Sequence, residues 1–316
     1  MTAPKEKKKR PRVVLITRKT PWEQLIATHG TEGQARFFLE SRGRQVAPVE
    51  ANHSEAAESL SRVEAALPTD LRRVSVERGD LDRFLFAPDD LICVVGQDGL
   101  VANVAKYLTG QPVIGINSNP GWFDGVLCPH TPGDFPALLD WILSGRGEEE
   151  RFELMERVLV GARRDDGLEL RALNEIFVGH RSHQSARYRM SAAGETERHS
   201  SSGVICATGT GATGWARSIL RQRKRDITPP APTEERLIWF AREPFPSVST
   251  GVSLEIGEFG AEESITLISE MGEGGVIFGD GMETDTMEFE EGRSVELSIA
   301  KERLQLVVPR AIFSLS

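Results

Sequence analysis

Residues 91–99 have the sequence Leu91-Ile92-Cys93-Val94-Val95-Gly96-Gln97-Asp98-Gly99, and this stretch decides the fold. Its five apolar residues, three of them β-branched, are typical of a strand that is buried on both faces. A loop bracketed by glycines follows, and then apolar residues at helical spacing, at positions 100, 101, 104, 105 and 108. This order predicts one strand–loop–helix unit of an open parallel sheet, in which ligands bind at the carboxyl ends of the strands.

Similar patterns flank this stretch on both sides. Apolar, β-branched runs at residues 13–17 and 112–116 predict two further buried strands. Helices are expected over residues 21–42 with a break at Gly30, over 55–67 and over 135–143. Strands that alternate with helices indicate a parallel sheet covered by helices. We therefore expect an α/β nucleotide-binding domain over residues 12–147.

From residue 148 onward short strands dominate the pattern. Asp165-Asp166-Gly167 predicts a hairpin turn, and one helix is expected near residues 214–225. The expected strands are 153–162, 168–178, 187–192, 252–256, 264–268, 276–278, 294–299 and 304–308. A run of strands without crossover helices predicts an all-β, sandwich-like domain up to residue 316, which would bind the substrate. Whether its last strand returns to the first domain stays open.

The composition narrows the class of protein. A chain of 316 residues with 39% hydrophobic residues suits two domains. A net charge of −9 argues against a nucleic-acid partner, and no apolar run of about 18 residues predicts a membrane span. The lysine- and arginine-rich residues 1–11 predict a disordered tail without the apolar segment of a secretory signal, so a cytoplasmic location is expected.

No metal site is expected. The cysteines, Cys93, Cys128 and Cys206, are too far apart for a zinc motif. His180 and His183 stand three apart, which on a strand places them on opposite faces. The acidic residues after Gly279-Asp280-Gly281 are typical of a solvated hairpin.

The loop Gly96-Gln97-Asp98-Gly99 is the first candidate site. Glycines allow the backbone to approach a phosphate, and the N-terminus of the following helix offers free N–H groups. The Asp98 carboxylate can act as a base toward a hydroxyl or hold a magnesium ion. The alternative is that Asp98 only caps the helix that starts near Leu100.

The second candidate site is the segment Thr208-Gly209-Thr210-Gly211-Ala212-Thr213-Gly214, which follows an apolar strand and opens a helix. Its three glycines match the G-x-G-x-x-G dinucleotide fingerprint, so a Rossmann-type oxidoreductase that uses Gly209, Gly211 and Gly214 is one alternative. That fold needs further strand–helix alternation, whereas mostly strands follow here. A nucleotide-contacting loop and a purely structural turn both remain open.

Asn174-Glu175 is the third candidate, beside the apolar residues 176–178. An amide next to a carboxylate can bind both the amine and a ring nitrogen of an adenine. Ordinary polar residues at a strand end have the same pattern.

The order of these motifs resembles that of the NAD kinase family, which shares its fold with diacylglycerol and sphingosine kinases. Members carry G-G-D-G after a strand, then P-v-I-G-I-N, L-N-E, T-P-T-G-S-T-A-Y and a late D-G turn. This chain has, in the same order, Gly96–Gly99, Pro112–Asn117, Leu173–Glu175, Thr208–Trp215 and Asp280-Gly281. The resemblance spans residues 12–310, and residues 117–128 are more similar to the divergent, mitochondrial-type branch.

The resemblance implies an enzyme that transfers the γ-phosphoryl group of ATP to the 2′-hydroxyl of NAD and so makes NADP. Asp98 would be the base that takes the hydroxyl proton. Mg²⁺ would neutralise the transferred group, and a homodimer or homotetramer is implied. The residues implied to bind substrate or nucleotide are Gly96, Gln97, Gly99, Asn117, Asn174, Glu175, Thr208, Thr210, Gly211 and Thr213.

Several residues depart from the family pattern. Gln97 replaces the second glycine of its motif, and Ser202 stands where an aspartate usually contacts the substrate. Gly209 and Gly214 replace a proline and an alanine, which predicts a looser loop, and Trp215 replaces a tyrosine. The donor (ATP or polyphosphate) and the acceptor (NAD, NADH or another nucleoside-like molecule) stay open. A non-catalytic dinucleotide-binding or sensing protein on the same fold is the main alternative.

Overall fold

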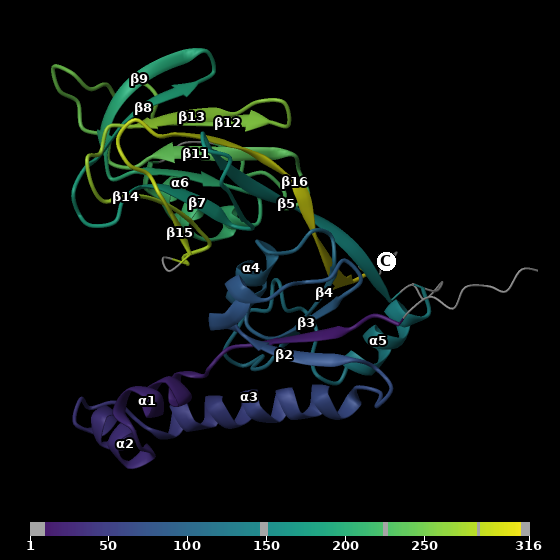
Figure 1. Cartoon of the computed structure of the whole chain (residues 1–316). Helices are drawn as coiled ribbons and strands as arrows, with labels where there is room; N and C mark the ends of the chain where they lie inside the picture. The colour runs from purple at the N-terminus through teal and green to yellow at the C-terminus, as the bar shows by residue number, and fades with distance from the viewer. Residues whose placement is uncertain (1–9, 146–150, 224–226, 283–284, 311–316) are drawn as a thin grey trace, which may run out of the picture. The chain divides into compact units, whose positions relative to one another are not determined.

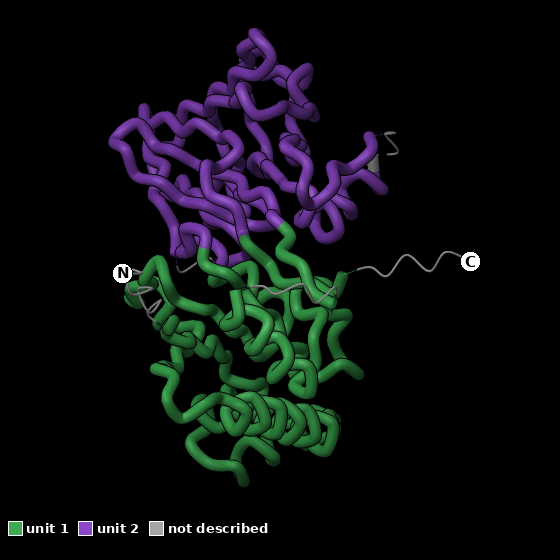
Figure 2. The backbone as a smooth tube through the Cα atoms, turned by 90° about the vertical axis from the view of Figure 1, so that its right-hand side faces the viewer, with its two compact units in different colours: residues 1–104, 111–155, 305–316 green, residues 105–110, 156–304 purple. Residues whose placement is uncertain are grey.

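The computed structural model describes residues 10–145, 151–223, 227–282 and 285–310. Residues 1–9 of the expected basic tail, the expected domain boundary at residue 147 and residues 224–225 of the expected helix lie outside this part. The chain forms two compact units, coloured in Figure 2: unit 1 comprises residues 1–104, 111–155 and 305–316, and unit 2 comprises residues 105–110 and 156–304. Within the described ranges, no helix has the length and apolar character needed to cross a membrane.

Unit 1 is built on a parallel sheet, as the sequence predicted. The central strand β1 (Val13–Thr17) lies between β2 (Arg73–Glu77) and β3 (Leu91–Gly96), and β3 pairs with β4 (Pro112–Asn117). The far edge of β4 pairs in parallel with residues 305–307 of the last strand. Side chains of β1, β3 and β4 are buried on both faces, which explains their unbroken apolar sequences.

Helices cover both faces of this sheet (Figure 1). The long helix α3 (Ala47–Ala66) and α5 (Phe135–Leu143) pack on one face in a single apolar cluster with β1, β3 and β4. Helix α4 (Asp98–Ala105) lies on the opposite face. Helices α1 (Pro21–His29) and α2 (Glu32–Glu40) form a hairpin beside the N-terminal end of α3.

The helix boundaries follow from local signals. Thr20 and Glu23 form a capping box at the start of α1, and Gly30, with φ of 89°, ends that helix. The predicted break at Gly30 is therefore confirmed. Helix α3 begins eight residues before the predicted start at residue 55, because Pro48 occupies its first turn, where a proline is tolerated.

Unit 2 contains two antiparallel sheets that enclose an apolar core. One follows the order β16-β13-β8-β9, and the other follows β12-β11-β10-β7-β14-β15. The core draws residues from both sheets, which confirms the sandwich-like prediction. The strands are β5 (Phe152–Arg164), β6 (Glu169–Ala172), β7 (Glu175–His180), β8 (Ala186–Ala192), β9 (Glu195–Ser201), β10 (Val204–Ala207), β11 (Arg236–Ala241), β12 (Ile256–Gly260), β13 (Ile265–Ser269), β14 (Gly275–Gly279), β15 (Thr286–Glu288) and β16 (Ser294–Pro309).

The expected strands of unit 2 differ from the structure in three places, and strands β9, β11 and β15 were not expected. Residues 168–178 form two strands, β6 and β7, because the N–H groups of the intervening residues bind Asp280. Residues 252–255 are not a strand, because Glu197 accepts the N–H groups of Ser253 and Leu254. The two strands expected after residue 294 are one continuous strand, β16.

The helix of unit 2 is α6 (Trp215–Arg223), preceded by the short 3-10 turn η2 (Gly211–Thr213). Strand β10, which leads into them, pairs antiparallel with both β7 and β11. A Rossmann fingerprint needs a parallel strand–helix–strand unit. The alternative of a Rossmann oxidoreductase at Gly209, Gly211 and Gly214 is therefore wrong.

Candidate functional site

Asp98 lies at the carboxyl end of β3, in the first turn of α4. Its Oδ1 accepts the backbone N–H groups of Leu127 at 2.8 Å and Cys128 at 3.0 Å, and its Oδ2 accepts that of Val126 at 2.9 Å. All three bonds go to the segment that follows β4, so the side chain holds that segment rather than capping its own helix. An ionised carboxylate has about four acceptor sites. Three are used here, so one site on Oδ2 stays available to a ligand hydroxyl.

The segment of residues 117–128 is fixed from several sides. Asn117, at the end of β4, donates to the carbonyl of Phe123 and accepts the N–H of Asn119. Gly115 leaves room for the segment, since a Cβ there would lie 2.1 Å from the Leu127 carbonyl oxygen. Asn117 thus positions the backbone of this segment, and the structure gives it that role whether or not it also contacts a ligand.

A cavity of about 520 Å³ opens at the carboxyl ends of the parallel strands. All of its lining residues belong to unit 1. Gly96 and Gln97 line it, together with the residue that ends β1 and the one that ends β2, Thr17 and Glu77. Gly99 is exposed in the first turn of α4. The cavity therefore occupies the edge of the sheet where open α/β folds bind ligands, as predicted.

In unit 2, Asn174 and Glu175 lie on a backbone that is held on both sides. Asp280 accepts the N–H groups of Leu173 at 2.8 Å, Asn174 at 2.7 Å and Glu175 at 3.4 Å. From the other side, the hydroxyl of Thr208 donates to the Leu173 carbonyl and the Thr208 N–H donates to the Asn174 carbonyl. The structure thus brings Asn174, Glu175 and Thr208 together within one unit.

Two carboxyl groups of this cluster have raised pKa values. Burial raises the pKa of Glu175 to about 7, and the nearby charge of Asp280 adds to the effect. Burial also raises the pKa of Asp280 to about 6, although its hydrogen bonds from the Leu173 and Asn174 N–H groups oppose the shift. Titrating groups with such values near neutral pH are common at functional sites.

The glycine- and threonine-rich loop is tightly packed, so the predicted looser loop is wrong. A Cβ on Gly211 would lie 2.1 Å from the Asn174 carbonyl oxygen, and a Cβ on Gly209 would lie 2.1 Å from the Ala231 carbonyl oxygen. Both glycines are needed because backbone packs directly against them. Thr208 is fully buried, and its hydroxyl also accepts the N–H groups of Thr210 and Gly211.

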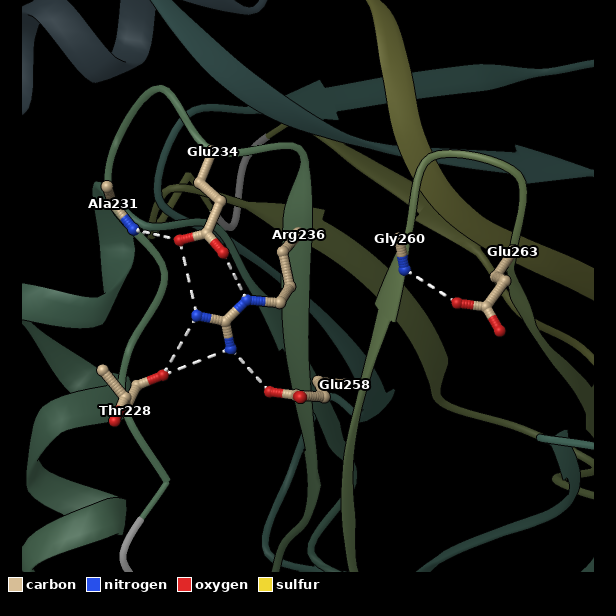
Figure 3. A network of polar contacts seen from close by, with 7 residues as sticks. All are labelled: Thr228, Ala231, Glu234, Arg236, Glu258, Gly260 and Glu263. Carbon is tan, nitrogen blue, oxygen red and sulfur yellow. Dashed lines mark hydrogen bonds and ion pairs between the residues drawn. The ribbon is translucent and has the colours of Figure 1, made fainter.

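The segment that packs on Gly209 is itself anchored, as Figure 3 shows. Arg236 donates to Glu234 at 2.7 Å, to Glu258 at 2.6 Å and to the carbonyl of Thr228 at 3.2 Å. Glu234 also accepts the N–H of Ala231 at 2.9 Å. These bonds hold residues 228–234 in place, so the glycine loop rests on a fixed support.

Comparisons with known proteins agree with this arrangement. No family model matches the chain. The chain superposes on an NAD kinase from Archaeoglobus fulgidus in complex with ATP with a TM-score of 0.55 and 19% identity, over 93% of this chain and 92% of that one. It superposes on yeast NADH kinase complexed with NADH with a TM-score of 0.58 and 15% identity, over 95% of this chain and 84% of that one. The fold is that of the NAD kinases.

One curated relative is similar in sequence. The chain is 29% identical over 123 residues to a probable NADH kinase of Oryza sativa subsp. japonica. The matched segment makes up 34% of this chain and 36% of that protein, so it covers about a third of the relative.

Within the NAD kinase fold, the remaining predicted residues have distinct surroundings. Thr213 is exposed and donates its hydroxyl to the carbonyl of Thr210, whose own side chain is buried. Trp215 stacks on Phe177, and the Arg242 guanidinium lies over its ring at 5.0 Å from the centroid. Ser202 is exposed, and its N–H donates to the Arg242 carbonyl.

The two histidines that were expected to point apart instead line one small cavity in unit 2. His180 ends β7, so the chain turns before His183 and strand alternation no longer applies. Across the described residues, no group of three histidine, cysteine or acidic side chains could hold a metal ion.

The main residue whose role was mispredicted is Asp280, expected in a solvated hairpin. Its side chain instead accepts three backbone N–H groups, and its backbone is left-handed with φ of 53°. The Asp-Gly pair after the apolar strand β14 was the available signal, since aspartate and glycine tolerate that conformation.

Proposed function

We propose that this protein is a kinase that transfers the γ-phosphoryl group of ATP to the 2′-hydroxyl of the adenosine ribose of NAD or NADH. The observation that carries the proposal is the position of Asp98. Its carboxylate is fixed by three backbone N–H bonds at the carboxyl end of β3. Gln97, directly before it in sequence, and Leu100, two residues after it, line the cavity of unit 1. The likeness to NAD kinase folds supports the same reading.

In the proposed reaction the ribose hydroxyl oxygen forms a bond to the γ-phosphorus, and the bond from that phosphorus to the β-phosphate oxygen breaks. The leaving group is ADP, and the hydroxyl proton passes to the free acceptor site on Asp98 Oδ2. Since such reactions depend mainly on positioning and charge stabilisation, a rigidly held carboxylate suits this role.

Magnesium enters this scheme as part of the nucleotide substrate. Mg²⁺ usually keeps several waters and binds substrate phosphates plus one or two carboxylates. Across the described residues, no three histidine, cysteine, aspartate or glutamate side chains lie close enough together to hold a resident metal ion. The ion would therefore arrive with the phosphates of ATP and neutralise their charge during transfer.

The dinucleotide acceptor is assigned to the cluster of unit 2. The backbone of Asn174, which carries the side-chain amide, is fixed by its hydrogen bond to Asp280. The raised pKa of Glu175 allows its carboxyl group to be protonated near neutral pH and to donate a hydrogen bond. Which of NAD and NADH is preferred, a cytoplasmic location and a homodimeric or homotetrameric state remain predictions from the family resemblance.

A second candidate function is a non-catalytic dinucleotide-binding protein on the same fold. The three hydrogen bonds of Asp98 favour it, because they give this carboxylate a structural role that needs no catalysis.

The test is to incubate the purified protein with Mg²⁺, ATP or polyphosphate, and NAD or NADH, and to measure NADP or NADPH. The Asp98→Asn variant should lose turnover by on the order of 10²–10⁴-fold while it keeps its affinity for the dinucleotide. The exposed neighbour Asp124 provides the control Asp124→Asn, which should keep full turnover. Dinucleotide binding without turnover by the wild-type protein, whatever the donor, would replace the kinase by the non-catalytic candidate.

A further inference from the structure

Unit 2 includes a short segment from the first half of the chain, residues 105–110, which begins at the last residue of helix α4. This segment carries a buried cation, Lys106, whose side chain is only 3% exposed. Its Nζ lies 2.7 Å from Oδ2 of Asp285. A buried ammonium group is costly unless a carboxylate compensates its charge. The motifs recognised in the sequence do not account for this buried charge.

Asp285 is fixed by two donors from adjacent residues. Besides the ion pair with Lys106, its Oδ2 accepts the hydroxyl of Tyr107 at 2.7 Å. Partial burial would raise the pKa of Asp285, but the hydrogen bonds from Lys106 and Tyr107 outweigh this effect and lower it. Arg171 on β6 donates to the carbonyl of Leu108 at 3.1 Å and holds the segment further along. Residues 106–108 are therefore bound to unit 2 at three points.

The ion pair anchors the end of the turn that follows β14. The N–H of Asp285 donates to the carbonyl of Met282 at 3.2 Å, and the N–H of Met282 donates to that of Gly279 at 3.1 Å. Asp280 lies inside this turn, with its left-handed backbone. Lys106 therefore holds, through Asp285, the segment that sets the position of Asp280.

Asp280 in turn holds the backbone to which the dinucleotide is assigned. Its carboxylate accepts the N–H groups of Leu173, Asn174 and Glu175. An ionised carboxylate offers more acceptor sites for such bonds than a protonated one. Burial raises the pKa of Asp280, whereas its N–H bonds and the positive charge of Lys106 oppose that shift. The charge that acts on Glu175 is instead the negative one of Asp280. Lys106 thus favours an ionised Asp280 beside a protonated Glu175.

We propose that Lys106 is a positioning residue for the dinucleotide. Its ion pair with Asp285 fixes the turn that carries Asp280, and Asp280 then fixes the backbone of Asn174 and its neighbours. The inference rests on the proposed kinase function, because it concerns binding of the phosphoryl acceptor. Lys106 acts through the two aspartates and touches neither substrate itself.

The variant Lys106→Met separates a local role from a general one. An apolar side chain of similar size in place of a buried charge is often neutral or stabilising, and Asp285, whose side chain is 34% exposed, can turn to water. The melting temperature should therefore stay close to that of the wild type. Amide hydrogen exchange at residues 173–175 should become faster by on the order of tenfold. The exposed Lys301 on β16 provides the control Lys301→Met, which should change neither quantity.

Kinetics and calorimetry test the effect on the substrate. In Lys106→Met the KM for NAD or NADH and the Kd for NADH should rise by on the order of tenfold, while kcat and the affinity for MgATP stay at wild-type values. Adding Asp285→Asn should change these values little further, because the ion pair is already lost. The milder variant Tyr107→Phe removes the second donor to Asp285, should raise the same KM by less, and keeps the test open if Lys106→Met does not fold.

The two proposals fail separately. If the wild type never forms NADP or NADPH, but Lys106→Met binds NADH more weakly and exchanges faster at residues 173–175, the kinase function is lost and this role is kept. If the wild type turns over while Lys106→Met and Tyr107→Phe have its KM and its exchange rates, the kinase function is kept and this role is overturned. Equal losses of NADH and MgATP affinity with a lower melting temperature would also overturn it, because they indicate general destabilisation.

Discussion

The Asp98 carboxylate accepts the backbone N–H of Leu127 at 2.8 Å, which joins the first turn of α4 to the segment that follows β4. Two more N–H groups of the same segment bind the same carboxylate. The residue assigned as the base is therefore also a support for its own surroundings. A change at Asp98 should alter both the chemistry and the local structure, and the two effects can be measured apart.

The structural effect is best seen in Asp98→Ala, which removes both acceptor oxygens and with them all three hydrogen bonds. The exposed N–H of Val126 can turn to water, but those of Leu127 and Cys128 are buried and lose their partner. We expect a loss of about 2 kcal/mol in the free energy of unfolding, together with faster amide hydrogen exchange at residues 126–128. Asp124→Ala should change neither quantity. Normal protection of these amides in Asp98→Ala would contradict the structural role.

The pH dependence of stability should report on Glu175. Its pKa is about 7 in the folded protein and 4.5 in the unfolded chain, so the folded state binds more protons between these values. The stabilising contribution is complete below pH 4.5 and is lost as the pH rises through about 7. Glu175→Gln should lack this decrease in the free energy of unfolding. Above neutral pH its free energy of unfolding should exceed that of the wild type by on the order of 1–2 kcal/mol.

Denaturant unfolding at several pH values measures this slope. Asp280 stays in both proteins and contributes a slope of the same sign, since its pKa is also raised. The exposed Glu169 on β6 provides the control Glu169→Gln, which should follow the wild-type curve. If the free energy of unfolding of Glu175→Gln changes with pH as that of the wild type does, Glu175 does not have the raised pKa.

The contact of Gly211 with the Asn174 backbone can be tested with one methyl group. In Gly211→Ala the new Cβ would lie 2.1 Å from a carbonyl oxygen, so the backbone must shift. We expect the free energy of unfolding to fall by on the order of 2–3 kcal/mol. Dinucleotide binding should also weaken, because the shifted backbone carries Asn174. Gly33→Ala is the matched control: it adds a methyl group to the open face of α2 and should stabilise by up to about 1 kcal/mol. Thermal melts that rank the two variants the other way would refute the close contact.

Much of the parallel sheet could be predicted from the sequence, because buried parallel strands carry unbroken apolar runs. Strands β1, β3 and β4 have that pattern, and each was expected. The edge strand β2 was missed, because only its two valines are apolar and its burial is partial. Local periodicity is weak wherever a strand is covered only in part.

The candidate site was less predictable, because its contacts join distant parts of the chain. Asp280 lies more than a hundred residues from Leu173, whose N–H it accepts. Nothing in the acidic sequence around Asp280 distinguishes a buried carboxylate from a solvated one. Arg18 and Arg44 likewise line one cavity although α1 and α2 separate them in the sequence.

Strand β16 has a consequence for synthesis on the ribosome. Its residues 305–307 complete the sheet of unit 1 beside β4, while its residues 294–297 pair with β13 in unit 2. During translation the edge of β4 therefore stays unpaired while about 190 further residues are synthesised. This takes about 10–40 s at ~5–20 residues per second. An uncovered apolar edge invites pairing with other chains. The nascent protein is thus most in need of a chaperone in the interval between these two strands, and early termination in β16 should harm the half of the protein that was made first.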